Sequence, residues 1–311
     1  MDKINFADRL VEAIQKKGNA ICVGLDPRLD KIPEVVKGPI MREAEEQSPM
    51  RLVAEMFLEF NKGIIDAVAD IVPVVKPQIA FYEVYGPDGI WAYQETIRYA
   101  QSKGLLVIAD VKRNDIGTTA EAYASAYLGE INVLDDVVMP VFGADSLTIN
   151  PYLGWDGVKP FIEEADNFGG GVFVMVKTSN STSGDLQDLQ VADGNRVFEV
   201  VAQYVDSWGS DYIGESGYSL LGAVVGATYP SEAKILRRLM PNAFFLVPGY
   251  GAQGGSAEDV KPCFNRDGLG ALVNSSRGII FAYERMEYDP AAYAEAARAA
   301  VLEMKNALDI F

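Results

Sequence analysis

Eight short apolar runs recur along the chain, and longer segments with helically spaced apolar residues separate them. The runs are rich in Val, Ile and Leu and do not alternate with polar residues, which is typical of strands covered on both faces. We therefore predict strands at residues 20–25, 72–76, 105–110, 146–149, 171–176, 220–225, 244–247 and 271–274.

The segments between these runs place apolar residues on one face and polar residues on the other, as amphipathic helices do. Helices are predicted at residues 51–69, 88–103, 118–128, 194–208, 231–239 and 290–308. Strands that alternate with helices indicate an α/β fold with a parallel sheet. A doubly wound open sheet shares this alternation, but eight units over 311 residues favour a (β/α)8 TIM barrel.

Three segments fit neither pattern. Residues 27–50 contain four prolines and form an insertion after the first strand, with room for a short helix. Residues 178–190 are rich in Ser, Thr and Asp, and GYGAQGG at 249–255 is a glycine-rich loop. Because no linker, low-complexity tail or repeat is visible, we expect one domain over residues 1–311.

Composition narrows the possible chemistry. The chain is 49% hydrophobic and 23% charged, which is ordinary for a globular protein. It contains no histidine, and this excludes Ser-His-Asp and Cys-His catalysis and zinc sites of the HExxH type. Acid–base chemistry must therefore use carboxylates, Lys, Tyr or Cys.

Charge and cysteine content argue against binding to nucleic acids or membranes and against cysteine-based metal sites. The 27 Lys and Arg residues against 44 Asp and Glu residues give a formal charge of −17, which repels nucleic acids and anionic membranes. Cys22 and Cys263 lie far apart without ligand-like spacing, so we expect reduced, packed thiols. The first twenty residues lack an uncharged apolar segment, and no run of 18 apolar residues follows, so we expect a cytoplasmic protein.

Polar side chains stand where several predicted strands end. In a TIM barrel the reacting groups lie at the carboxyl ends of the strands and in the loops that follow. A single such residue would mean little, because it often only pairs with a neighbour, but five strands share the feature. The residues are Asp26, Lys76, Asp110 with Lys112, Thr178 with Ser179, and Ser275, Ser276 and Arg277.

The segment ADVKRNDIG at 109–117 is the densest of these signals. Asp110 and Lys112 share one side of an extended strand, because side chains alternate with a period of two. Asp115 follows just before a predicted helix, where it could also serve as a helix-start residue. A structural salt bridge is the simpler interpretation of Asp110 and Lys112 alone. Lys76 changes this, since an alternating Lys-Asp-Lys-Asp array is costly without a charged ligand.

A phosphate site is predicted separately. TIM barrels often bind phosphate with the loops after strands seven and eight, and these loops contain Gln253 and Arg277. Glycine-rich backbone can approach a phosphate closely, and Arg can bind it with two hydrogen bonds. Alone, the glycine cluster could be a flexible turn and Arg277 a surface residue. The occurrence of both features in these two loops favours a phosphate-binding site.

With these motifs the chain resembles the orotidine 5′-phosphate decarboxylase family, in particular its longer bacterial members. The similarity covers nearly all of the predicted barrel, and DVKxxDIG preceded by a strand-end Lys is its most specific element. The matching motifs are VGLDP at 23–27, VKPQIAFYE at 75–83, ADVKRNDIGTTA at 109–120, INPYLGWD at 149–156, VKTSN at 176–180, VPGYGAQGG at 247–255 and NSSRG at 274–278.

The resemblance implies a (β/α)8 barrel that converts orotidine 5′-phosphate to UMP and CO2 without a metal or an organic cofactor. Lys76, Asp110, Lys112 and Asp115 would form the catalytic array. In such enzymes the last aspartate reaches into the neighbouring subunit's site, which implies a homodimer.

The resemblance also implies substrate contacts. Asp26 and Lys76 would hold ribose hydroxyls, Ser179 the pyrimidine ring, and Ile116 and Thr119 would approach from the partner subunit. Gln253 and Arg277 would bind the phosphate, with the Tyr250 or Gly254 N–H as a further donor, and Pro248 would be a further substrate contact. Ser181-Thr182 follows Asn180 where Pro-Gly is frequent in the family, so the shape of this loop does not carry over.

Two other functions are compatible with parts of the pattern. A related sugar-phosphate barrel, such as an aldol-type synthase, uses DxKxxD carboxylates to hold Mg²⁺. Lys76 and the Thr-Ser-Asn loop argue against it. A non-catalytic nucleotide-binding barrel is the second alternative, and the intact four-charge array counts against that.

Overall fold

A computed structural model describes residues 3–43, 47–134, 137–251 and 254–308. The chain divides into two compact units. Unit 1 comprises Met1–Ala20, Lys112–Asn274 and Ile310–Phe311, and unit 2 comprises Ile21–Val111 and Ser275–Asp309.

All eight predicted strands are present and form a closed barrel in the order β1-β10-β9-β8-β7-β6-β3-β2. The barrel strands pair in parallel within each unit. This confirms the (β/α)8 TIM barrel and excludes the doubly wound open sheet. The strands are β1 (Ile21–Leu25), β2 (Val74–Pro77), β3 (Leu106–Arg113), β6 (Ser146–Ile149), β7 (Gly171–Lys177), β8 (Ser219–Val225), β9 (Ala243–Val247) and β10 (Ala271–Ser275).

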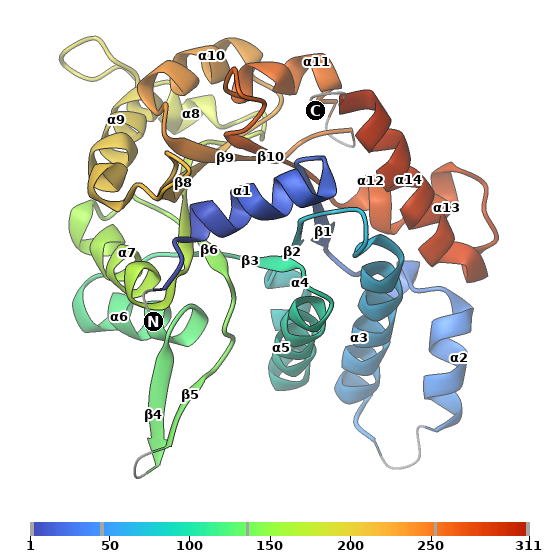
Figure 1. Ribbon diagram of the computed structural model, residues 1–311. Helices are drawn as coiled ribbons and strands as arrows, with labels where there is room; N and C mark the ends of the chain where they lie inside the picture. Colours follow the sequence, from blue (N-terminus) through green and yellow to red (C-terminus); the bar gives the residue numbers. More distant parts are fainter. Residues whose placement is uncertain (1–2, 44–46, 135–136, 252–253, 309–311) are drawn as a thin grey trace. The chain divides into compact units, whose positions relative to one another are not determined.

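Unit 2 contains long helices, of which α5 contacts β2. Helices α3 and α5 lie side by side, as Figure 1 shows in blue and teal, and their apolar faces bury residues such as Phe57, Ile64 and Ile97. The insertion after β1 contains the short helix α2, as expected. The helices are α2 (Glu34–Arg42), α3 (Pro49–Val68), α4 (Ala80–Glu83), α5 (Gly86–Ser102), α12 (Arg277–Ile280), α13 (Ala282–Arg285) and α14 (Tyr293–Leu308), with 3-10 turns Leu29–Lys31 and Pro290–Ala292.

A glycine in β1 allows close packing near the start of α12. A Cβ atom on Gly24 would lie 1.8 Å from Oγ of Ser276, which directly precedes Arg277. Any side chain at this position would displace Ser276, so the glycine of the VGLDP motif fixes where α12 begins.

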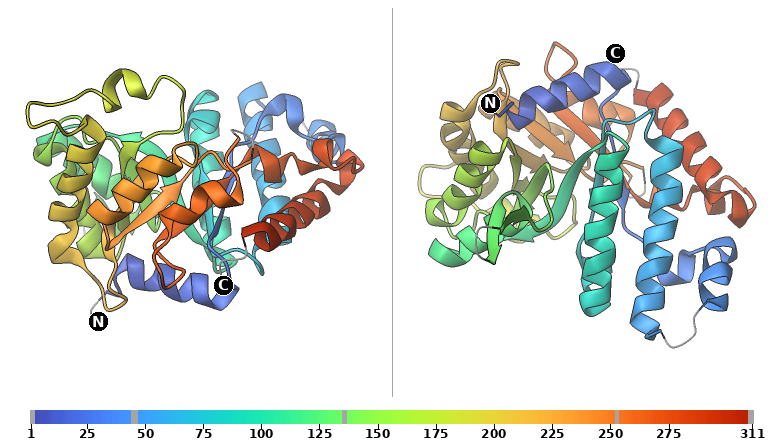
Figure 2. Two further views of the ribbon diagram at one scale, coloured as in Figure 1. Left: turned by 90° about the horizontal axis from the view of Figure 1, so that it is seen from above. Right: turned by 60° about the horizontal axis from the view of Figure 1, so that its bottom comes forward.

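Unit 1 contains the remaining helices. Four of those described, α1, α7, α8 and α11, were not among the predicted helices. The loop that contains α8 contacts α9 and is visible in yellow-green in Figure 2. The helices are α1 (Phe6–Lys17), α6 (Gly117–Tyr127), α7 (Trp155–Phe168), α8 (Gly184–Gln187), α9 (Val197–Gly209), α10 (Pro230–Leu239) and α11 (Ala257–Val260), with 3-10 turns Ser210–Tyr212 and Lys261–Cys263.

An antiparallel hairpin between α6 and β6 was also not predicted. Strands β4 (Glu130–Leu134) and β5 (Val137–Pro140) pair only with each other among the described strands, and all nine of their residues are exposed. The hairpin extends away from α6 and α7 (Figure 1). Its apolar run therefore resembles a buried strand in sequence but packs against no core.

Both cysteines are free and buried, as expected. Over the described residues, no helix is long and apolar enough to cross a membrane.

Candidate active site

Lys76 and Asp110 form a buried ion pair at the ends of β2 and β3. The Nζ atom of Lys76 lies 2.8 Å from Oδ2 of Asp110, and the residues are 5% and 7% exposed. The Ile79 N–H donates to the Asp110 carbonyl at 3.2 Å, which ties the two strand ends together. Two members of the expected charged array, Lys76 and Asp110, are therefore in direct contact.

The surroundings of Lys76 keep it charged. Burial lowers the pKa of the ammonium, but the negative charges of Asp110 and Asp26 outweigh this effect, and the pKa is raised above its ordinary value. Asp26 is half-buried and follows β1. Unit 2 thus gathers three of the predicted site residues into one electrostatic group.

A buried polar network fixes the backbone next to Asp26. The Tyr82 hydroxyl donates to the Leu25 carbonyl at 2.9 Å and accepts from the Asn61 side-chain amide at 2.8 Å. The same amide also contacts the Thr96 hydroxyl at 3.1 Å. Tyr82 is fully buried, so it packs in the core and positions the backbone beside Asp26.

Lys112 has an unusual backbone conformation. Its φ angle is 46°, which is uncommon for a residue with a long side chain and costs about 1–3 kcal/mol. Its backbone N–H donates to the Thr148 hydroxyl of β6 at 3.0 Å, which helps to hold this turn. The strand therefore departs from an extended conformation at Lys112, and simple alternation does not set its side-chain direction. The side chain is exposed.

Asp115 lies in the loop between β3 and α6. Its carboxylate accepts from the Ile116 N–H at 2.8 Å. The N-cap of α6 is Ile116, without a side-chain cap, so Asp115 does not itself cap the helix. Ile116 is 53% exposed, and Thr119 is exposed in the first turn of α6.

Ser179 is held closely by the segment after β8. A Cβ atom on Gly226 would lie 2.8 Å from the backbone N and Cα atoms of Ser179. The Thr228 hydroxyl donates to the Ser179 carbonyl at 3.3 Å. Only glycine at position 226 permits this approach.

Backbone hydrogen bonds hold the described residues on either side of 252–253 in the loop after β9. The Gly254 N–H donates to the Gly251 carbonyl at 2.9 Å, and the Pro248 carbonyl accepts from the Ala227 N–H at 2.9 Å. Gln253 lies outside the described residues. A phosphate bound through the Gly254 N–H would have to replace its bond to Gly251.

Arg277 is the first residue of the four-residue helix α12 in unit 2. Its side chain is exposed, and the preceding Ser276 is half-buried against Gly24. The guanidinium is therefore on the surface of unit 2, where a ligand in solution can reach it.

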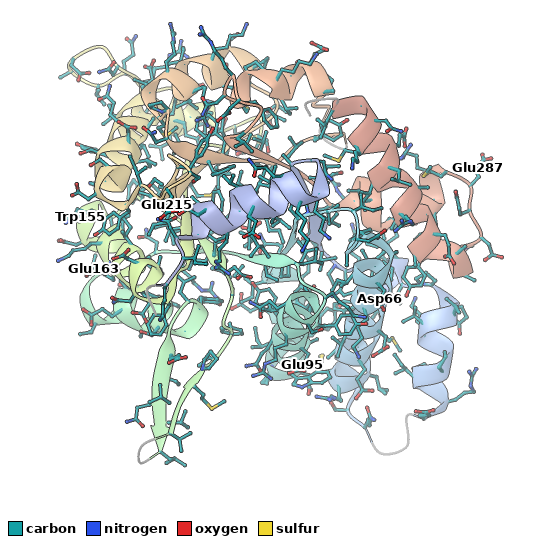
Figure 3. The ribbon with its side chains drawn as sticks, viewed as in Figure 1. Asp66, Glu95, Trp155, Glu163, Glu215 and Glu287 are labelled. Atoms are coloured by element: carbon teal, nitrogen blue, oxygen red, sulfur yellow. The ribbon has the colours of Figure 1, made fainter. Side chains whose placement is uncertain are left out.

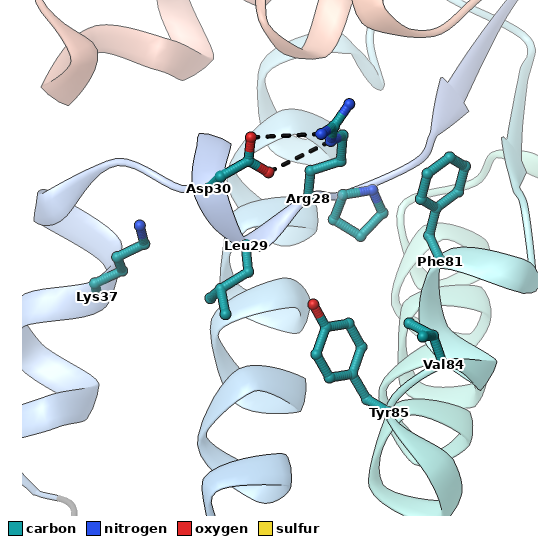
Figure 4. Close-up of a pocket in the computed structure, with 8 residues that line it drawn as sticks. Arg28, Leu29, Asp30, Lys37, Phe81, Val84 and Tyr85 are labelled. Carbon is teal, nitrogen blue, oxygen red and sulfur yellow. Dashed lines mark hydrogen bonds and ion pairs between the residues drawn. The ribbon is translucent and has the colours of Figure 1, made fainter.

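The insertion after β1 lines a cavity of about 570 Å³ in unit 2. Figure 4 shows Arg28 paired with Asp30 at this cavity and the aromatic rings of Phe81 and Tyr85 facing it. The residues that line it are Pro27, Arg28, Leu29, Asp30, Lys37, Phe81, Val84 and Tyr85. None of the predicted site residues is among them.

The sequence analysis missed a buried charge at the end of a strand. Lys177 ends β7, is 0% exposed and lies 2.6 Å from Asp188. The sequence VMVK ends in lysine just as IVPVVK does at Lys76, so the rule that located Lys76 would also have located Lys177. Within the described part of the chain, no group of three or more His, Cys, Asp and Glu residues could hold a metal ion.

Comparison with known proteins gives consistent matches. A sequence model of the Orotidine 5'-phosphate decarboxylase / HUMPS family matches residues 19–291. Orotidine 5'-phosphate decarboxylase of Rhodopirellula baltica is 45% identical over 309 residues, covering 98% of this chain and 99% of that protein. The protein of the same name from Caldicellulosiruptor bescii is 46% identical over 282 residues, covering 90% and 91%. The solved structure of Leishmania donovani OMP decarboxylase matches with a TM-score of 0.72 at 30% identity, covering 98% of this chain and all of that one.

Proposed function

The chain belongs to the Orotidine 5'-phosphate decarboxylase / HUMPS family, and from this membership we propose that it converts orotidine 5′-phosphate to UMP and CO2 without a metal or an organic cofactor. The observation that carries the proposal is the buried Lys76–Asp110 pair, with Lys112 two residues further along β3. A buried ion pair is a weak device for stability, so its place at two strand ends favours a catalytic role.

Lys112 is the proposed proton donor. Loss of CO2 leaves negative charge on C6 of the pyrimidine, and an ammonium beside that carbon stabilises the charge and then protonates it. A charge pair at 4 Å contributes about 4 kcal/mol at an effective dielectric constant of 20. The φ angle of 46° at Lys112 supports this role, since strained backbone is concentrated at functional sites.

Asp110 and Lys76 are proposed to complete the charged group. Asp110 would lie near the departing carboxylate and disfavour it in the ground state. The raised pKa of Lys76 keeps it cationic, as required to hold a ribose hydroxyl beside Asp26. The main catalytic contribution is assigned to the orientation of Lys112, with ground-state destabilisation by Asp110 secondary.

Phosphate is assigned to Gln253 and Arg277, with the Gly254 N–H as a further donor, and Pro248 is proposed as a further substrate contact. Binding energy from this remote group would be used at the chemical step, because loop closure on phosphate orders the site. The exposed position of Arg277 in unit 2 supports its availability to an anionic ligand. Ser179 is assigned to the pyrimidine ring.

A homodimer is proposed in which Asp115, Ile116 and Thr119 enter the partner's site. Exposed apolar side chains beside Asp115 support this: besides Ile116, Tyr152 is 76% exposed and Leu153 46% exposed. Trp155, labelled in Figure 3, is 40% exposed. A Cβ atom on Gly157 would lie 3.1 Å from the Asp115 carbonyl and 3.2 Å from Cβ of Leu153, so the two loops are adjacent. Such a patch is typical of a protein interface. We place the enzyme in the cytoplasm.

The deciding experiment follows the absorbance of orotidine 5′-phosphate with purified protein, with and without EDTA. We expect conversion to UMP at the same rate in both. Turnover that EDTA abolishes would favour the Mg²⁺-dependent sugar-phosphate chemistry of related barrels. Binding of UMP without any turnover would make the protein a nucleotide-binding barrel.

A further inference from the structure

Lys177 and Asp188 join the two ends of the loop that follows β7. The Nζ atom of Lys177 lies 2.6 Å from Oδ1 of Asp188, the residue directly after α8. The Lys177 side chain is 0% exposed, whereas that of Asp188 is 39% exposed. A fully buried ammonium is costly unless it is paired, so the carboxylate of Asp188 offsets the cost of burying Lys177 and fixes its position.

Aromatic rings surround the same ammonium. The Tyr229 ring centroid lies 4.7 Å from Nζ, and that of Phe198 lies 5.3 Å away. The Tyr229 hydroxyl donates to the Asn180 carbonyl at 3.2 Å, within the loop. The ring that covers Lys177 therefore also restrains the loop that Lys177 closes.

Thr178 and Gln187, the neighbours of Lys177 and Asp188 inside the loop, also bond to each other. The Thr178 N–H donates to Oε1 of Gln187 at 3.0 Å, and the Gln187 amide donates to the Thr178 hydroxyl at 2.8 Å. Two consecutive residues at one end of the loop thus bond to two consecutive residues at the other. The loop is closed at its base, directly beside Ser179.

Ser179 is fixed from the other side by the segment after β8. Gly226 packs against its backbone, and the Gly226 N–H donates to the Lys177 carbonyl at 2.8 Å. The position of Ser179 is thus set by Gly226 on one side and by the Lys177–Asp188 closure on the other.

We propose that Lys177 is a positioning residue whose ion pair with Asp188 closes the 178–188 loop and holds Ser179 in place for the pyrimidine ring. The inference rests on the proposed function, in which Ser179 contacts that ring. It separates two groups of the substrate: the pyrimidine depends on the ion pair, and the ribose phosphate does not.

The test compares Asp188→Asn and the double variant Lys177→Met/Asp188→Asn with the wild type. The double variant removes both charges and leaves no unpaired ammonium, so it should fold even if the single variant does not. In the double variant we expect kcat/KM for orotidine 5′-phosphate to fall roughly 10–100-fold, because a displacement of about 1 Å can cost this much. Competitive inhibition constants for UMP should weaken, while those for ribose 5-phosphate, which lacks the ring, should not change.

Glu163→Gln is the matched control, because it breaks an exposed ion pair with Lys159 on α7 and should change none of these values. A folded double variant with wild-type kcat/KM and wild-type UMP inhibition would overturn the inference alone. A wild-type protein without turnover of orotidine 5′-phosphate would overturn the proposed function, and this inference with it.

Discussion

The ammonium of Lys76 and the carboxylate of Asp110 lie 2.8 Å apart, and both side chains are almost completely buried. An ion pair in this setting responds very differently to the loss of one partner and of both. Single replacement leaves a buried charge, whereas double replacement removes the desolvation cost together with the attraction.

We predict that Asp110→Asn lowers the free energy of unfolding by about 3–5 kcal/mol and abolishes turnover. Urea unfolding and steady-state kinetics measure the two effects. The double variant Lys76→Met/Asp110→Asn should regain most of the stability and none of the activity. Recovery of turnover by the double variant would contradict the catalytic assignment.

The charge on Lys76 gives this stability a defined pH range. The pKa of Lys76 is higher in the folded state than its ordinary value of 10.5, so the folded state holds the proton more tightly. The stabilisation is therefore complete below about pH 10.5 and is lost as pH rises through the folded-state pKa.

Lys112→Ala should lower kcat by at least about 10³-fold, because both the stabilising charge and the proton donor are removed. UMP affinity, measured by calorimetry, should stay largely intact. Lys112→Arg is the control: it retains a cation that does not release its proton near neutral pH, so it too should be nearly inactive. Substantial turnover by either variant would remove Lys112 as the donor.

Arg277→Ala should lower kcat/KM for orotidine 5′-phosphate roughly 30- to 5,000-fold if phosphate desolvates the guanidinium. This corresponds to a loss of about 2–5 kcal/mol of transition-state stabilisation. The measurement is a comparison with orotidine, which lacks the phosphate and should react equally slowly with both proteins. An equal loss on both substrates would point to a general structural defect instead of phosphate binding.

Burial raises the pKa of the Cys22 and Cys263 thiols from 9.0 to about 12. The folded state keeps protons that the unfolded chain releases, so this stability is complete below pH 9 and declines as pH rises toward 12. Each thiol should contribute a slope of up to about 1.4 kcal/mol per pH unit, measured by urea unfolding between pH 8 and 10. Cys263→Ala should remove one thiol's share of the slope. Rapid reaction of either thiol with a thiol reagent in the native protein at pH 8 would contradict the burial.

Arg237 provides a test in the core of unit 1. Its guanidinium donates to the carbonyls of Met240, Ala243 and Cys263, as well as those of Pro241 and Gly270, at 2.8–3.2 Å. Arg237→Lys offers fewer donors and a different geometry, so we expect a loss of about 2 kcal/mol in unfolding free energy. Chemical denaturation checks this, and an unchanged midpoint and slope would refute it.

The fold was predictable because each barrel strand is buried on both faces. Every predicted barrel strand is present, and β6 has the predicted bounds of residues 146–149. The hairpin β4–β5 escaped prediction for the opposite reason: an apolar run indicates burial, but these strands are exposed. Helix α7 was hidden by Pro160, which lies within the helix although proline usually ends one.

The site was predictable where a residue's place at the end of a strand is enough to determine its neighbours. Lys76 and Asp110 could be paired from sequence because β2 and β3 are consecutive and parallel. The turn at Lys112 could not be predicted, since its positive φ is held by a hydrogen bond to Thr148, 36 residues away. Similarly, the closeness of Ser179 and Gly226 depends on the packing of two loops, which local sequence does not encode.

The hairpin β4–β5 also affects how the protein should be handled. Its edges expose Ile131, Val133, Leu134, Val137 and Val138, while the whole chain has a formal charge of −17. In dilute buffer, the electrostatic repulsion between molecules reaches about 30 Å and keeps their β4–β5 hairpins apart. In molar salt the range of this repulsion shrinks to about 3 Å, and the β4–β5 hairpins of different molecules can then pair through their exposed strand edges. Concentrated stocks should consequently stay clear at low ionic strength and turn cloudy as salt is added.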